Sequence, residues 1–207
     1  MHLTRADIDR SHASARQALG DCCDMHRNVM RLFGSAPGTR TDGKILYRVL
    51  EEAGKPRLYI TSHEKPDLSQ AAWLFHGREA RQRDLTPLLA AFAQGAEFGF
   101  DVLTYPCKKT DVGRSNSVRA FLQTPDERRA WLGRQGEKNG FLLLACREDE
   151  PADIRGARKT GAIQIRTVRF TGVLRVTDAI AFRRGYECGI GPEKAYGLGM
   201  LLLKRGW

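Results

Sequence analysis

The stretch GIGPEKAYGLG at residues 189–199, followed directly by the apolar run MLLL at 200–203, is the most informative part of the sequence. Its paired glycines allow positive φ angles and close approach of the backbone to a partner, which predicts a glycine loop that leads into a buried strand. The spacing fits neither a Walker A loop nor the dinucleotide-binding fingerprint. What remains is a loop with free backbone N–H groups and Lys194, which suits either oligonucleotide phosphates or packing against another element.

The charge balance favours a polyanionic partner. The sequence has 34 Lys and Arg residues against 24 Asp and Glu residues, with a formal net charge of +10 and a pI near 9.7. This excess favours binding to nucleic acid through counterion release, although a solvated basic surface is the alternative. The length of 207 residues allows one large domain or two of about 100 residues each, and we expect two.

Neither a membrane span nor a secretion signal is expected. No apolar run approaches about 20 residues and the N-terminal residues lack the apolar core of a signal peptide, so we expect a cytoplasmic protein. The five cysteines include no Cys-x-x-Cys pair, which argues against a disulfide framework and a four-ligand zinc site. We expect reduced thiols, with no metal and no cofactor.

The first half of the chain has the element order β-α-β-β-α-β, which is typical of the ferredoxin-like fold. The periodicity and the turn residues predict these elements. They are a strand at 3–8, helices at 13–19 and 22–33, strands at 45–50 and 57–61 around Gly54, a mostly helical segment at 73–92 and a strand at 98–103.

The second half has the same order, imperfectly. Its expected elements are a strand near 118, a helix at 126–138, a strand at 141–146, a half-buried hairpin at 163–176, a helix from 178 to 186 and the strand at 200–203. We expect the charged segment 148–161 to be a mobile loop. The sequence therefore predicts an α+β fold with a first domain at 1–106 and a second at 107–207.

The helix at 22–33 places His26 at a border between apolar and polar faces. Asp21 is the predicted N-cap. His26 falls at the edge of the apolar arc beside Arg27 and Arg31, which favours a partly exposed imidazole. The alternatives are a structural histidine and a metal site shared with Cys22, for which the sequence offers no further ligands at a fitting spacing.

Two segments resemble a known family. Residues 168–178 read VRFTGVLRVTD and the loop at 189–199 reads GIGPEKAYGLG, and both look like motifs of the CRISPR-associated endoribonuclease CasE family, in the RAMP superfamily. Shorter matches at 46–49, 58–62 and 131–141 follow in the same order, so the resemblance runs nearly end to end. It implies two ferredoxin-like (RRM-like) domains in tandem, in agreement with the element order.

The resemblance also implies the catalytic residues. The family carries Asp-x-Tyr-x-x-His before a basic helix, and the corresponding residues here run from Asp21 to His26, with Cys23 in place of the tyrosine. In the family this histidine is catalytic and the tyrosine assists it, so His26 is the expected catalytic residue. A basic residue near the histidine is also implied, and Lys159 is the first choice.

RNA supplies its own nucleophile, because a 2′-OH lies next to the scissile phosphate. The enzyme then needs a base, an acid and positive charge rather than a metal. With an ordinary pKa of about 6.5, His26 can serve as base or acid near neutral pH. A second group must protonate the 5′-oxygen or stabilise the phosphorane, and Arg158 and Arg166 are further candidates beside Lys159.

The function implied by the resemblance is metal-independent cleavage of CRISPR repeat hairpins in precursor RNA. The products would carry 5′-OH and 2′,3′-cyclic phosphate ends, and the protein would stay bound to the mature RNA in the Cascade complex with its other subunits. The alternatives are a catalytically inactive RNA-binding scaffold subunit of the same superfamily and a general RRM-like RNA binder. The basic residues expected to contact RNA are Arg27, Arg31, Lys108, Lys109, Arg158, Arg166, Arg169 and Lys194.

Overall fold

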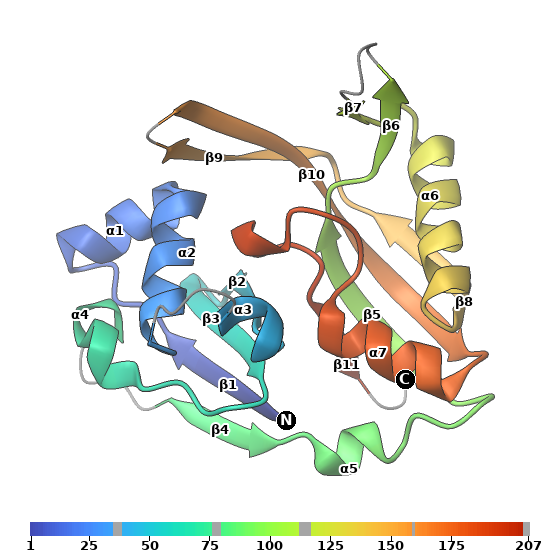
Figure 1. Ribbon diagram of the computed structural model, residues 1–207, viewed down its shortest axis with the longest axis horizontal. Helices are drawn as coiled ribbons and strands as arrows, with labels where there is room; N and C mark the ends of the chain where they lie inside the picture. The colour runs from blue at the N-terminus through green and yellow to red at the C-terminus, as the bar shows by residue number, and fades with distance from the viewer. Residues whose placement is uncertain (35–38, 76–79, 112–116, 159, 205–207) are drawn as a thin grey trace.

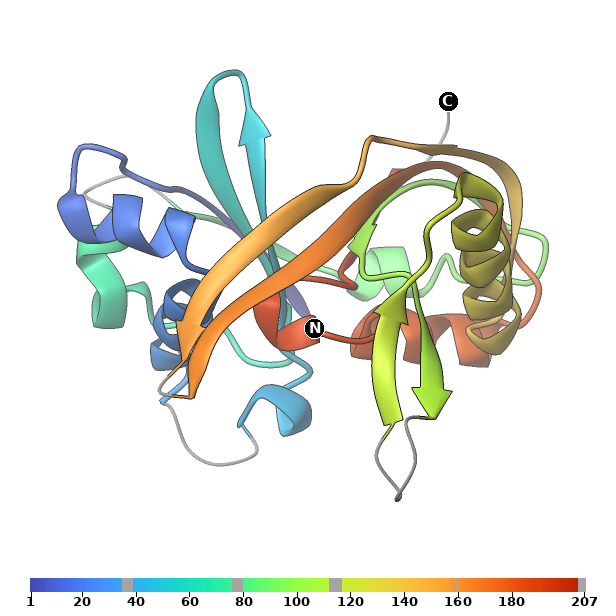
Figure 2. The same ribbon diagram turned by 90° about the horizontal axis from the view of Figure 1, so that it is seen from above.

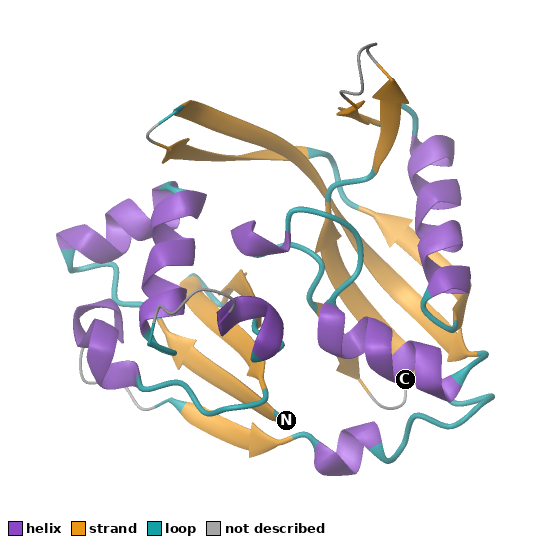
Figure 3. Ribbon diagram, viewed as in Figure 1, coloured by secondary structure: helices purple, strands orange, loops and turns teal. Residues whose placement is uncertain are grey.

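The computed structural model describes residues 1–34, 39–75, 80–111, 117–158 and 160–204. It contains two mixed α/β units, each built on an antiparallel sheet (Figure 1). Helices pack on one face of each sheet (Figure 3). The predicted α+β class is confirmed.

The N-terminal unit, residues 2–84, has the strand order β2-β3-β1-β4, with all neighbours antiparallel. This is the strand order of the ferredoxin-like fold. Its elements are β1 (His2–Asp7), α1 (Ala13–Gly20), α2 (Cys22–Arg31), α3 (Thr39–Asp42), β2 (Leu46–Glu52), β3 (Lys55–Ser62), η1 (Leu68–Ala71), α4 (Ala72–Phe75) and β4 (Arg81–Asp84).

The C-terminal unit, residues 97–204, has the equivalent order β11-β5-β10-β8. The short helix α5 (Thr86–Leu89) lies between the two units in the chain. The elements of the C-terminal unit are β5 (Glu97–Thr104), β6 (Cys107–Asp111), β7 (Ser117–Phe121), α6 (Pro125–Lys138), β8 (Phe141–Glu148), β9 (Ala152–Arg158), β10 (Gly161–Val176), α7 (Ala179–Cys188), η2 (Lys194–Tyr196) and β11 (Leu201–Lys204).

Each unit has its own hydrophobic core. In the N-terminal unit, Leu58 and Ile60 of β3 pack with Val29 of α2. In the C-terminal unit, Phe170 of β10 packs with Phe182 of α7. Alternate residues of a strand face the same side, so the apolar alternation of the sequence places these side chains on the helix-covered faces. Two separate cores explain why the chain forms two units.

The strand predicted at 98–103 as the last of the first half is β5, and its assignment was wrong. It pairs with β10 and β11 of the C-terminal sheet, whereas β4 is the fourth strand of the N-terminal sheet. The sequence RQRD of β4 is exposed along its length, so no apolar alternation marks it as a strand. By sheet membership, we propose a boundary between residues 84 and 97 in place of the predicted one at 106.

One further prediction of local structure was wrong. In place of a helix at 73–92, the described residues form α4, β4 and α5, because short elements carry little of the periodicity that identifies longer ones. The strand predicted near 118 is confirmed as β7. It pairs with β6 in a separate hairpin and is not part of the main C-terminal sheet.

The segment predicted as a mobile loop at 148–161 instead contains β9, which pairs with the first half of β10. The predicted hairpin at 163–176 is one long strand, because β10 continues into the sheet between β5 and β8. We call β9 and residues 161–167 of β10 the arm. The arm leaves its own sheet and reaches across to α2 of the N-terminal unit (Figure 2).

The two units are joined by buried polar contacts. Arg48 of β2 donates to Asp101 of β5 at 2.7 Å, and Arg169 of β10 binds the same carboxylate. The glycine loop also packs on the N-terminal unit. Gly197 has a φ of 79°, and a Cβ there would lie 3.1 Å from the ring of Tyr47. At this position the packing role of the glycine loop is confirmed.

Candidate active site

Helix α2 orients His26. The side chain of Asp21 caps the helix by accepting hydrogen bonds from the backbone N–H groups of Cys23 and Asp24, at 2.8 and 3.0 Å. Its second oxygen accepts a hydrogen bond from the backbone N–H of Ala157 in the arm, at 3.1 Å. The predicted N-cap is confirmed, and it also attaches the arm to the start of the helix.

The His26 imidazole lies between residues of both units. It stacks on Tyr47 of β2, with ring centroids 6.4 Å apart and an angle of 18° between planes. On another side it meets Tyr196 of η2 edge to face, also at 6.4 Å and at 67°. Its Nδ1 atom is buried and has no hydrogen-bond partner among the described residues. The Nε2 atom is therefore the ring nitrogen left for a substrate.

The surroundings keep this imidazole neutral. Burial lowers the pKa of His26 below its ordinary value of 6.5, and the positive charges of Arg40 and then Arg27 lower it further. At neutral pH His26 is thus neutral, and with its one proton on Nδ1 its Nε2 atom is an acceptor, which is the form required of a general base.

Two titratable groups near His26, Tyr47 and Cys22, are held in their protonated forms. The Tyr47 hydroxyl donates to the carbonyl of Ala195 at 2.8 Å, and burial raises its pKa well above the ordinary value. Burial, followed by the neighbouring Cys23, raises the pKa of the Cys22 thiol to about 12. Cys23, at the position of the family tyrosine, is buried, so its thiol is not presented to a substrate.

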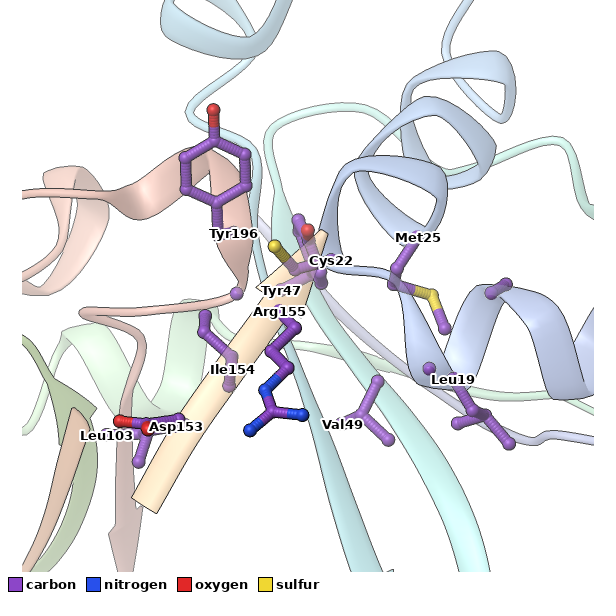
Figure 4. Close-up of a pocket in the computed structure, with 13 residues that line it drawn as sticks. Leu19, Cys22, Met25, Tyr47, Val49, Leu103, Asp153, Ile154, Arg155 and Tyr196 are labelled. Atoms are coloured by element: carbon purple, nitrogen blue, oxygen red, sulfur yellow. The ribbon is translucent and has the colours of Figure 1, made fainter. Parts of the chain in front are cut away.

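Two hollows are lined by residues that contact the histidine. One, of about 420 Å³, is lined by Cys22, Tyr47, Arg155 and Tyr196 among others. Figure 4 shows Arg155 on the arm and Tyr196 on the facing loop, with Cys22 and Tyr47 between them. The other hollow, of about 460 Å³, is lined by Tyr196 together with Lys109, Arg119 and Arg158. Tyr196 is shared by both hollows.

The structure brings part of the predicted basic set to His26. Arg158 lies over the ring of Tyr196, with its guanidinium carbon 5.2 Å from the ring centroid. Arg27 is next to His26 on α2 and forms an exposed ion pair with Asp24 at 3.0 Å. Lys109 reaches the neighbouring hollow from β6. Lys159, the first choice for the second catalytic group, lies outside the described residues.

Other predicted residues lie apart from the histidine or are already engaged. Arg166 sits over Phe121 at 5.7 Å. Arg169 is bound to Asp101 and lies 3.7 Å from Asp149, so its charge is largely matched. Arg31 donates to Asn28 at 3.3 Å, and Lys108 is exposed on β6. Lys194 is partly buried, and burial followed by the charge of Arg40 lowers its pKa.

Sequence reasoning missed three residues of this site. Tyr47 and Tyr196 contact the histidine, and the charge of Arg40 acts on it. Tyr196 lies inside the glycine stretch that the sequence singled out, but nothing in that stretch indicates that it meets α2. Among the described residues, no group of three or more His, Cys, Asp or Glu side chains could hold a metal at Cys22 and His26.

None of the helices in the described parts of the chain combines the length and apolar character of a membrane crossing.

Comparison with known proteins gives one consistent relationship. A family model described as "CRISPR associated protein" matches residues 1–205. The chain is 26% identical to the CRISPR-associated endoribonuclease Cse3 of Thermus thermophilus, over 97% of this chain and 98% of that protein. It is also 26% identical to the CRISPR system Cascade subunit CasE of Escherichia coli, over 98% of each.

Solved structures agree with this relationship. Thermus thermophilus Cse3 bound to an RNA representing a pre-cleavage complex has a TM-score of 0.85 at 25% identity, covering 98% of both chains. The crystal structure of Cas6e from Escherichia coli has a TM-score of 0.68 at 22% identity, covering 100% of both chains, and supports the fold.

Proposed function

Because the chain belongs to the CRISPR-associated protein family, as a member of its CasE group, we propose that it is an endoribonuclease that cleaves CRISPR repeat hairpins in precursor RNA. The observation that carries this proposal is the His26 imidazole, which is kept neutral between residues of the two units with its Nε2 atom available to a substrate. Both curated relatives carry CRISPR-related names, and one is named an endoribonuclease.

The reaction needs no added nucleophile. His26 Nε2 takes the proton of the 2′-OH next to the scissile phosphate, and the 2′-oxygen attacks phosphorus. The bond from phosphorus to the 5′-oxygen then breaks, which leaves a 2′,3′-cyclic phosphate on one product and a 5′-OH on the other. A positioned base of this kind contributes roughly 10²–10⁴-fold to the rate.

Positive charge stabilises the phosphorane formed in this step. Arg158 is proposed for this role, because it lies over Tyr196, whose ring contacts the histidine. Lys159 follows Arg158 directly in the chain, and its proposed catalytic role rests on the family resemblance. Arg166 lies over Phe121, and we assign it to RNA binding.

The RNA backbone is proposed to cross the basic side chains around the two hollows. Phosphate contacts of this kind fix the position of an RNA hairpin without reading its sequence. Arg169 is expected to contribute least, since Asp101 already binds it. The remaining proposed contacts are Arg27, Arg31, Lys108, Lys109, Arg158, Arg166 and Lys194.

Retention of the product in a Cascade complex is part of the same proposal. The Escherichia coli relative is named a Cascade subunit, and a CRISPR RNA-guided surveillance complex contains a chain 25% identical to this one with a TM-score of 0.73. The partners are then the repeat hairpin and other Cascade subunits. The cytoplasmic location expected from the sequence is the one that this role requires.

The proposal is tested by incubating the protein with its labelled host repeat RNA in EDTA. Wild type is expected to cut once per repeat, whereas His26→Ala is expected to bind the hairpin without cutting it. RNA with a 2′-deoxy substitution upstream of the cut is also expected to stay intact. Binding without cleavage by the wild type would instead favour the inactive scaffold, and equal binding to unrelated hairpins would favour a general RNA binder.

A further inference from the structure

The side chains around His26 differ in whether they can give up a proton. The Tyr47 hydroxyl is already donated to a carbonyl, and burial raises its pKa. The Cys22 thiol has a pKa raised to about 12 by burial. Arg40 and Arg158 carry guanidinium groups, which keep their protons throughout the range of protein chemistry. None of these four can protonate a leaving oxygen easily.

Tyr196 differs from all of them. Its ring meets the His26 ring edge to face, with 6.4 Å between centroids, and its side chain is partly exposed. It is the residue shared by the two hollows. In Figure 4 its hydroxyl points away from Arg155 and Asp153. An RNA strand that occupied both hollows would therefore meet Tyr196 beside His26.

Arg158 is the second observation that bears on this tyrosine. Its guanidinium lies 5.2 Å from the centroid of the Tyr196 ring, within the range of a cation–π contact. Such a contact holds the ring in place.

We propose that Tyr196 is the general acid of the cleavage reaction and His26 its general base. While His26 Nε2 takes the proton of the 2′-OH and the 2′-oxygen bonds to phosphorus, the Tyr196 hydroxyl gives its proton to the 5′-oxygen as the phosphorus–oxygen bond breaks. The phenolate then takes a proton from water and His26 releases one, so no further reactant is consumed. This assignment rests on the proposed function.

The first test compares hydroxyl deletions on two tyrosines whose ring centroids lie equally far from that of His26. We expect Tyr196→Phe to slow single-turnover cleavage about 100-fold while the Kd for the hairpin changes less than threefold. Tyr47 also lies 6.4 Å from the histidine, but its hydroxyl is used in a structural hydrogen bond. Tyr47→Phe is therefore expected to lower the Tm more and the cleavage rate less. Equal rates for Tyr196→Phe and wild type would overturn the assignment.

The second test separates acid catalysis from positioning. In RNA with a 5′-bridging sulfur at the cut, the thiolate leaves without a proton, so Tyr196→Phe should cleave it within about threefold of wild type. His26→Ala should remain slow on the same RNA, because the 2′-OH still needs a base. A Tyr196→Phe defect that persists on this RNA would overturn the role as acid. Failure of the proposed function itself would look different, since wild type would then cleave neither RNA.

Discussion

The backbone N–H of Ala157 donates to Asp21 at 3.1 Å, and the same carboxylate caps the helix that carries His26. Ala157 precedes Arg158, which lies over Tyr196. One side chain thus fixes the arm of the C-terminal unit relative to the histidine of the N-terminal unit. The proposed catalytic site between the two units therefore depends on the hydrogen bond from Ala157 to Asp21 as well as on the histidine itself.

Asp21→Ala is expected to lower both stability and cleavage. Loss of an N-cap costs about 1 kcal/mol, and loss of the bond to Ala157 frees the arm. Asp178→Ala is the matched control, because Asp178 caps α7 through Ile180 and Ala181 at 2.9 and 3.0 Å and has no contact with the arm among the hydrogen bonds of the described residues. Thermal melts and single-turnover rates should show that both variants lose stability and that Asp21→Ala alone loses cleavage. Equal cleavage by the two would contradict the coupling.

Asp101→Asn is expected to be strongly destabilising. Arg48 is 2% exposed and would lose the carboxylate that balances its charge, for which a broken buried pair typically costs about 3–5 kcal/mol. Glu97→Gln is the comparison, because Glu97 pairs with Arg175 on the exposed surface between the same two strands, β5 and β10. An exposed pair contributes about 0–1 kcal/mol. Urea unfolding of both variants measures the difference, and similar losses would show that the buried pair is not what joins the units.

The pH dependence follows from the lowered pKa of His26. The cleavage rate is expected to be level between pH 7 and 8 and to fall only at pH values lower than the ordinary histidine pKa of about 6.5, as the base becomes protonated. Stability should move in the same direction, since the unfolded chain binds the proton more readily. The stabilisation from neutral His26 is present above the unfolded pKa and is lost as the pH falls through the folded pKa. A pH–rate profile that rises towards acid would contradict the role of His26 as base.

Salt should weaken hairpin binding steeply. Each phosphate contact adds roughly 0.7–0.9 to the slope of log K against log salt, so Lys109→Ala should reduce the slope by about 1. Lys55, the first residue of β3 after the turn at 53–54, is outside the proposed path, and Lys55→Ala should leave the slope unchanged. A flat plot for the wild type would mean that phosphate contacts are not a major source of affinity.

Much of the fold could be predicted from the sequence, because its long elements carry clear signals. The apolar arc and the Asp21 cap identify α2, and Pro125 marks the start of α6. The membership of β5 could not be predicted, because apolar alternation shows that a strand is buried but not which sheet it joins. The arm could not be predicted either, because most of β9 is exposed and the strand therefore shows little apolar alternation.

The candidate site was predictable only in part. His26 could be found because it shares a helix with its cap and its family motif, within a few residues of sequence. Tyr47 and Tyr196 are separated from it by 21 and 170 positions respectively. Folding of the N-terminal unit brings Tyr47 to the histidine, and docking of the C-terminal unit adds Tyr196. A single sequence gives no signal for contacts of that separation.

The most direct test of the account is the mass of the two RNA products after cleavage by the wild type in EDTA. Attack by the 2′-OH, with His26 as base, predicts a 5′ fragment that ends in a 2′,3′-cyclic phosphate and a 3′ fragment that begins with a 5′-OH. A 3′-OH paired with a 5′-phosphate would mean that water attacked the phosphate, and it would contradict the mechanism.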